Sequence, residues 1–305
     1  MNGAPRKIEI LNPFEEAIEI TKKILFQPFV FEKWLIIGFA AFLAGSFGGG
    51  GSFRFPLNHF GSKYTNHPLV SPDWEQWKPW LFVGIIAVAV AVFILIFVLM
   101  WLRSRGTFIF TDCIARNRAA IVEPWREFRR EGNSYFLFLL VIFLCWIGLI
   151  GLMLAPIWLC VHLLNHQNYF AGASIGLMLV AVWLCFTFVF GLTSYFMIPL
   201  MYVRRCRAGD AFRQVARLIL DNPGPFVLFA LFGFCLLIAV AIISAVATCA
   251  TCCIAALPYV GTVILLPVFV CLRAFGLLFI RQFGPDYDVW AAVPQSPVPP
   301  PLPSQ

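Results

Sequence analysis

Charged residues are scarce in this sequence. They make up 12% of its 305 residues, whereas soluble domains carry about 25%. Hydrophobic residues account for 61% of the chain, and the mean hydropathy is +0.85. Several apolar runs are also longer than the roughly 20 residues that a helix needs to cross a bilayer. The composition therefore excludes an ordinary soluble protein and predicts an all-α, polytopic membrane protein.

Acidic residues are missing from the middle of every apolar run. All fifteen Asp and Glu residues lie in the predicted termini and loops or at a helix edge. Proton-coupled carriers and pumps usually hold a carboxylate inside the membrane, because a group there must titrate or bind an ion. Their absence argues against that class. The N-terminal stretch also lacks the apolar segment of a cleavable signal peptide, so we expect none.

Six apolar segments predict six transmembrane helices in a single domain over about 1–288. The six are about 29–47, 79–102, 135–163, 172–202, 225–247 and 254–281. The first is the shortest, and a re-entrant half-span is the alternative for it. Lys and Arg are concentrated in alternate connections: the second has seven and the fourth has five, whereas the first has three and the third and fifth have none. By the positive-inside rule, both termini then lie in the cytoplasm, with the protein in the cell inner membrane. The Pro-rich segment 289–305 is predicted to be a disordered cytoplasmic tail.

The basic connections resemble one another. Each leads through a short amphipathic helix into a span, which predicts three pseudo-repeats of about 1–102, 103–202 and 203–281. Basic amphipathic helices bind anionic lipid headgroups when they lie at the membrane surface. A membrane or cytoplasmic protein partner is the other binding possibility, and simple padding of the bundle ends is the structural alternative. The candidate arginines of this surface are Arg126, Arg129, Arg130, Arg213 and Arg217.

Arg273 is a charged residue that the sequence places inside a predicted span. It precedes Arg281 by eight residues, about 12 Å along a helix, which is too deep for snorkelling alone. We expect its guanidinium to bond backbone carbonyls freed by Pro258 and Pro267, or to line a polar notch.

Three short motifs look functional but have simpler explanations. The string GASIG at 172–176 matches a nucleophile elbow, yet in an apolar helix it favours G-x-x-x-G helix packing. Cys249, Cys252 and Cys253 contain a C-x-x-C pair that could form a disulfide, but no further metal ligand is near in the sequence. The glycine-rich run 44–51 lacks the Lys-Ser/Thr of a phosphate-binding loop. The sequence thus predicts no catalytic residue, cofactor, metal or nucleic-acid partner.

Three stretches resemble an uncharacterised group of bacterial six-helix membrane proteins. They are NRAAIVEPWREFRREGNSYF, MIPLMYVRRCRAGDAF and LPYVGTVILLPVFVCLRAFGLLFIRQFGPDYDVW, and the likeness extends over most of residues 10–290. That group is similar to the membrane domain attached to some glycerophosphodiester phosphodiesterases, whose catalytic barrel is missing here. The resemblance implies a fold and a membrane location, and it carries over no catalytic residue.

Two functions follow from these patterns. The first is a non-enzymatic membrane scaffold whose basic helices bind anionic lipid or a partner. The alternative is a transporter or permease subunit for a neutral or amphiphilic molecule. Its internal polar residues would be Arg273, Thr262, Thr193 and Ser194. Intramembrane hydrolysis lacks a nucleophile with a suitable base.

Overall fold

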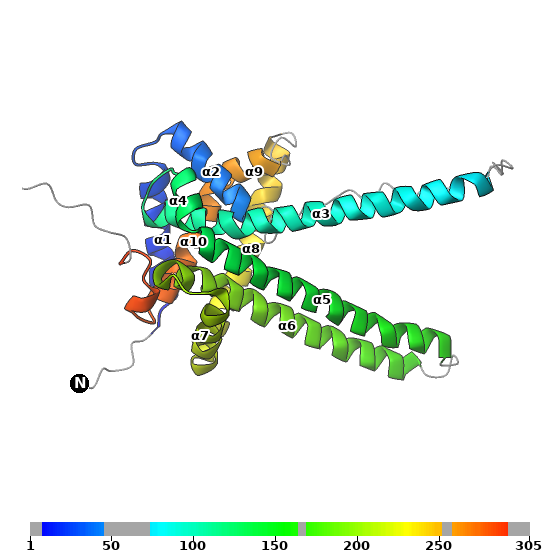
Figure 1. Cartoon of the computed structure of the whole chain (residues 1–305). Coiled ribbons are helices and arrows are strands. Elements are labelled where there is room, and N and C mark those ends of the chain that lie inside the picture. Colours follow the sequence, from blue (N-terminus) through cyan, green and yellow to red (C-terminus); the bar gives the residue numbers. More distant parts are fainter. Residues whose placement is uncertain (1–7, 46–73, 164–168, 252–257, 292–305) are drawn as a thin grey trace, which may run out of the picture.

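The computed structural model describes residues 8–45, 74–163, 169–251 and 258–291, and the regular structure within these ranges is helical (Figure 1). The helices are α1 (Leu11–Leu25), α2 (Phe31–Gly45), α3 (Trp74–Ala115), α4 (Val122–Glu127), α5 (Arg129–Leu163), α6 (Tyr169–Arg204), α7 (Ala208–Asp221), α8 (Pro223–Ala250), α9 (Pro258–Ile264) and α10 (Leu266–Arg281). A short 3-10 turn, η4 (Pro285–Tyr287), follows.

Four of the described helices are long and apolar enough to cross a membrane. The segments are Phe82–Ala115, Arg129–Leu152, Gly176–Arg204 and Pro223–Ala250. Every residue from 82 to 98 of α3 is exposed, so the described protein covers no face of this part of the helix. An apolar helix with this exposure suits a lipid environment, because its backbone bonds are internal and its side chains need no water.

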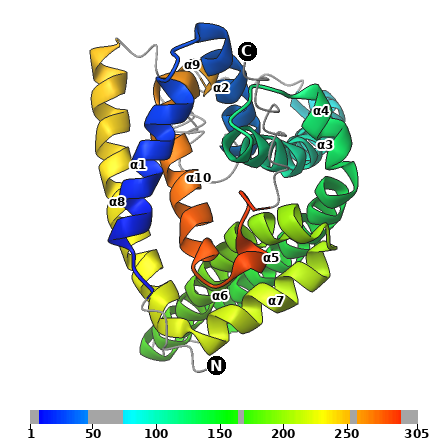
Figure 2. The same cartoon turned by 90° about the vertical axis from the view of Figure 1, so that its left-hand side faces the viewer.

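The molecule has a compact end and long helical arms (Figure 1). We call the region that holds α1, α4, α7 and α10 the compact end. From it α5 and α6 extend side by side, with the rings of Trp146 and Trp183 4.9 Å apart, while α3 diverges from them. α8 lies beside α1 and α10 and runs across the direction of α5 and α6 (Figure 2).

Aromatic rings from α1, α6, α8 and α10 form much of the core at the compact end. The ring of Phe229 lies 4.5 Å from that of Phe279 and 5.0 Å from those of Phe196 and Phe275. Phe14 extends the cluster from α1. Such offset and edge-on pairs each contribute about 0.5–1.5 kcal/mol beyond the burial of area. The cluster therefore holds α8 against the other helices.

The first and last predicted spans are not single long helices. α2 has 15 residues, which corresponds to about 22 Å. The last segment breaks at Leu265 into α9 and α10. Pro267, in the first turn of α10, has no N–H to donate to the preceding turn, which explains the break. The structure thus supports four crossing helices by length and composition.

The predicted repeat boundary at residue 102 falls inside one helix. α3 continues to Ala115, so residues 103–115 extend the span instead of starting an interfacial helix. Hydroxyls of this segment donate to carbonyls one turn earlier: Ser104 to Trp101 (2.7 Å) and Thr107 to Arg103 (2.8 Å). Their polar groups are therefore satisfied, and the segment can be buried.

The short helices α1 and α7 pack their apolar faces on the protein itself. α1 buries Ala17 and Ile24 and contacts α10. α7 contacts α6 and buries Ala211 and Val215. Protein rather than lipid thus covers these faces.

The folded part also extends past the predicted start of the tail. Val289 is fully buried, and Trp290 packs against the compact end. The prediction that disorder begins at 289 is therefore wrong for these residues, and 292–305 lies outside the described residues.

Candidate functional site

The arginines chosen from the sequence all have exposed side chains. They are Arg126 in α4, Arg129 and Arg130 at the start of α5, and Arg213 and Arg217 on α7. Within the described part of the chain, none of them is in an ion pair. α7 packs against α5, where the N–H of Ala208 donates to the hydroxyl of Ser134 (3.0 Å). The two groups of arginines thus lie on neighbouring elements.

Asp112 is the centre of a separate ion-pair network. Its carboxylate is fully buried and accepts a hydrogen bond from the hydroxyl of Tyr202 (2.8 Å). It also pairs with Arg116 (3.1 Å) and Arg118 (3.0 Å). Arg118 in turn reaches the exposed Glu123 (2.6 Å). A buried carboxylate is stable only when cations and hydrogen bonds compensate it, and Asp112 has both.

Glu127 joins the ends of α3 and α6 to this network. Its carboxylate accepts from Arg116 (2.9 Å) and from Arg205. Burial opposes the charge of Glu127, but these two hydrogen bonds outweigh it and hold the pKa of the carboxyl below its ordinary value of 4.5. The guanidinium of Arg205 lies 3.9 Å from Glu131 and 3.9 Å from the ring centroid of Phe128.

Two sets of charges lie around α4, α5 and α7, apart from the separate pairs Arg204–Asp286 and Arg281–Glu16. Four acids form a network with three arginines: Asp112, Glu123, Glu127 and Glu131 with Arg116, Arg118 and Arg205. The five exposed arginines named above form the other set, which we call the free arginines. None of the free arginines is in an ion pair in the described structure, although Asp210 and Asp221 of α7 lie three residues before Arg213 and four after Arg217.

Arg273 lies inside the fold of the compact end and is 8% exposed. Its Nη2 and Nε donate to the hydroxyl of Thr111 at 2.8 and 3.3 Å, and its guanidinium carbon lies 5.4 Å from the ring centroid of Tyr195. Among its described contacts, none is with a backbone carbonyl or a carboxylate. Thr193, proposed for the same polar path, donates to Val189 within its own helix (2.7 Å).

Replacing Arg273 with Met is expected to leave the midpoint of thermal unfolding unchanged or to raise it. A buried cation loses its hydration, and a neutral hydroxyl and a ring face compensate only part of that loss. Met fills a similar volume without a charge. The measurement is the unfolding midpoint of the purified protein in detergent. A drop of several degrees would mean that the guanidinium has a stabilising partner beyond Thr111 and Tyr195.

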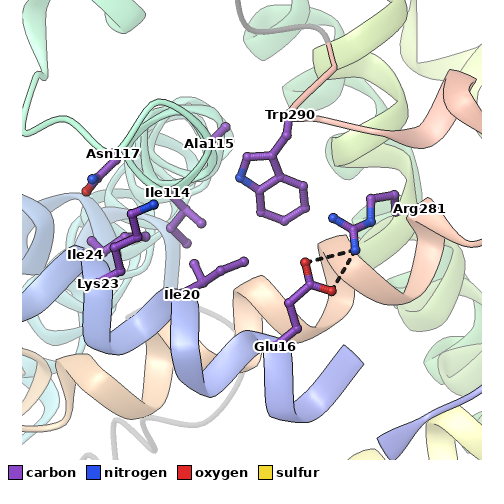
Figure 3. A pocket seen from close by; sticks show the side chains of 9 residues that line it. All are labelled: Glu16, Ile20, Lys23, Ile24, Ile114, Ala115, Asn117, Arg281 and Trp290. Atoms are coloured by element: carbon purple, nitrogen blue, oxygen red, sulfur yellow. Dashed lines mark hydrogen bonds and ion pairs between the residues drawn. The ribbon is translucent and has the colours of Figure 1, made fainter. Parts of the chain in front are cut away.

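A cavity of about 320 Å³ opens at the compact end (Figure 3). It is lined by Glu16, Ile20, Lys23, Ile24, Ile114, Ala115, Asn117, Arg281 and Trp290. Arg281 pairs with both carboxylate oxygens of Glu16 (2.7 and 2.9 Å), and the Trp290 ring centroid lies 5.5 Å from its guanidinium carbon. Lys23 and Asn117 lie on the opposite side from Trp290. The aliphatic floor and charged rim could hold a small amphiphilic molecule.

The chain matches a family of unknown function, DUF7544, over residues 9–289. The chain belongs to this family. The matched region of the DUF7544 protein runs from the residues just before α1 to Val289, so it contains both sets of arginines and Arg273. Neither a curated protein nor a solved structure matches the chain.

Sequence reasoning missed the central role of Asp112 in this DUF7544 chain. It assigned residues 103–134 to a connection, where an acid needs no partner. Arg116 and Arg118, four and six residues after Asp112, were the available signal, because the first of these spacings places opposite charges on one helix face. The cavity beside Trp290 was also missed, since its walls come from α1, from the end of α3 and from the C-terminal part of the chain, which are far apart in the sequence.

The remaining motifs give no site in the DUF7544 chain. Within the described residues, no three His, Cys, Asp or Glu side chains gather closely enough to hold a metal ion. Cys249 is exposed with a free thiol, while Cys252 and Cys253 lie outside the described residues. At Gly176, no described atom of another element lies within 4 Å of the position of a Cβ, so this glycine makes no close helix contact in the structure.

Proposed function

We propose that this protein is a non-enzymatic inner-membrane scaffold that binds anionic phospholipid headgroups through its free arginines. The membrane location is supported by four helices that are long and apolar enough to cross a membrane. The observation that carries the proposal is the separation of the arginines into two sets. The network of Asp112 engages Glu123, Glu127 and Glu131, and the free arginines stay exposed and outside any ion pair in the described structure.

The contribution of each free arginine to the free energy of lipid binding can be estimated from electrostatics. Each Arg near an anionic membrane surface contributes about 1 kcal/mol to binding. An arginine already in an ion pair would first have to leave its acid, which cancels much of that gain. The free arginines have no such cost, so they are the residues that an anionic headgroup would meet.

We include the membrane topology predicted from the sequence in the same proposal. Six crossings, three pseudo-repeats and cytoplasmic termini would place the free arginines at the inner leaflet, where anionic lipids are enriched. The relation to the membrane domain attached to glycerophosphodiester phosphodiesterases stays a prediction, as does the alternative function as a transporter subunit.

The test is the lipid that purifies with the protein. We compare the wild-type chain with a variant in which all five free arginines are Gln, both extracted gently from the same cell membranes. Mass spectrometry of the bound lipid is expected to show anionic phospholipid enriched over the bulk membrane for the wild type. The Gln variant is expected to lose most of this enrichment, because its surface charge falls by five.

A variant with Lys at the same five positions is the matched control, because it keeps the charge and should keep most of the enrichment. Equal anionic lipid on the wild type and the Gln variant would contradict the proposal. Loss of a co-purifying protein, with the bound lipid unchanged, would assign the free arginines to a protein partner instead.

A further inference from the structure

Arg105 has an unusual environment for a buried cation. Its guanidinium carbon lies beside two indole rings, 4.7 Å from the centroid of Trp101 and 4.9 Å from that of Trp125, and the two rings contact each other edge to face. The residue is only 7% exposed. Its Nη2 donates to the amide oxygen of Asn133 (2.8 Å), and its Nε has no hydrogen-bond partner among the described residues. Its described partners are thus neutral, and none is a carboxylate.

A second arginine lies beside it. The first turns of α5 contact Arg105 through Asn133 and through Gly132, where an added Cβ would lie 3.1 Å from the Cγ of Arg105. Arg129 precedes these residues by four and three positions, so it lies on the same face of α5, one turn nearer the helix start. A cation at this position adds a second positive charge on the side of α5 that faces Arg105. Arg130 has the same charge and exposure but lies about 100° further around the helix.

This pair of like charges lacks a described counter-ion. The acids nearest in the sequence belong to the network of Asp112, which leaves Arg105 and Arg129 without one. The first turn of a helix also carries the positive end of the helix dipole, which disfavours a cation there. Glu131 is the acid of this first turn, and it lies 3.9 Å from Arg205. An anion bound beside Arg105 and Arg129 would therefore lower the energy of the arrangement.

The location indicates the kind of anion. The fully exposed apolar part of α3 ends shortly before Trp101, and α5 becomes apolar from Tyr135 onward. The pair thus lies at the level where an apolar span meets the polar surface, and tryptophans are enriched at that level of a membrane. Phosphate oxygens match the planar fork of a guanidinium, which can donate two parallel hydrogen bonds.

We propose that Arg105 and Arg129, framed by Trp101 and Trp125, bind the phosphate group of one phospholipid at a defined site. This inference rests on the proposed function and narrows it from a basic surface to a single phosphate. Trp101 and Trp125 hold the guanidinium of Arg105 in place, and Arg129 supplies the second, accessible cation.

The experiment compares two neighbouring arginines. Phosphatidylglycerol is titrated into the purified, delipidated full-length protein in detergent, and native mass spectrometry gives the Kd of the tightest lipid. Arg129→Gln is expected to raise this Kd about tenfold or more, because hydrogen bonds between charged groups are lost. Arg130→Gln, the matched control, removes the same charge about 100° around the helix and is expected to raise the Kd by about fivefold or less.

Two further variants separate a site from a diffuse charge effect. Arg105→Lys keeps the charge but loses the planar fork, and Trp125→Leu changes no charge. Both variants are expected to raise the Kd of the most tightly bound phosphatidylglycerol. Their unfolding midpoints report whether they are folded. Arg129 is exposed, so its variant tests the proposal even if these two fail to fold.

The outcomes distinguish this site from the proposed function. Equal weakening by Arg129→Gln and Arg130→Gln would overturn the site and leave a diffuse basic surface. No weakening by either variant, nor by Gln at all five free arginines, would overturn both. Inorganic phosphate is added at matched ionic strength as a last arm. Displacement of the lipid by it would identify a soluble phosphate compound as the ligand of the same two arginines, and retention of the lipid supports a phospholipid.

Discussion

Replacing Asp112 with Asn is expected to lower the free energy of unfolding by about 3–5 kcal/mol, because it removes one partner of a buried ion pair. The carboxylate is fully buried and is held by Arg116, Arg118 and the hydroxyl of Tyr202. An amide fills the same volume but cannot compensate two guanidinium groups. The contact with Tyr202 also joins α3 to α6, so its weakening is expected to loosen the junction of the two helices.

Glu123→Gln is the matched control for Asp112→Asn. Glu123 also pairs with Arg118, but its side chain is 65% exposed, and surface pairs of this kind contribute about 1 kcal/mol or less. Both variants remove one negative charge from the same arginine. Unfolding in detergent, followed by circular dichroism, gives the two free energies. A loss for Asp112→Asn no larger than that for Glu123→Gln would show that Asp112 is not the centre of the network.

Replacing Gly106 with Ala is expected to lower the free energy of unfolding by about 2–3 kcal/mol, as overpacking in a close contact does. Gly106 lies where α3 crosses α2. A Cβ at this position would lie 2.4 Å from the Cβ of Leu43 and 2.8 Å from its backbone carbonyl carbon. A backbone atom cannot turn aside as a side chain can, so the two helices must separate. The crossing of α2 and α3 is the contact that this variant tests.

The control for Gly106→Ala is the same change in another apolar helix. At Gly233 of α8, no described atom of another element lies within 4 Å of the added Cβ. Ala is also the better helix former, so Gly233→Ala is expected to be neutral or to stabilise by up to about 1 kcal/mol. Equal unfolding midpoints for the two alanine variants would contradict a close contact of α2 and α3 at Gly106.

The helices themselves could be predicted from the sequence because their signals are local. Long apolar runs gave the spans of α3, α5, α6 and α8. The amphipathic pattern of the segment that forms α7 assigned Arg213 and Arg217 to its polar surface, and both are exposed in the structure. Each of these inferences needs only residues a few positions apart.

The errors arose where distant residues decide the outcome. The sequence predicted an interfacial helix for residues 103–115 of α3. These residues are instead buried, because α2, α5 and α10 pack against α3, and those contacts cannot be recognised from local spacing. The hydrogen-bond partner of Arg273 is Thr111, which lies 162 positions away, and Tyr202, one of the partners of Asp112, lies 90 positions away from it. Local spacing contains no information about such pairs. The sequence could nominate the free arginines, but only the structure shows that other arginines engage Glu123, Glu127 and Glu131.

The most direct test of the account is the affinity of the purified protein for phosphatidylglycerol in three forms: wild type, Gln at all five free arginines, and Lys at the same positions. Native mass spectrometry gives the affinities at two salt concentrations. We predict that the Gln variant binds far more weakly than the wild type and loses most of the salt dependence, while the Lys variant stays close to the wild type. The same affinity and the same salt dependence in all three proteins would contradict a lipid-binding role for the free arginines.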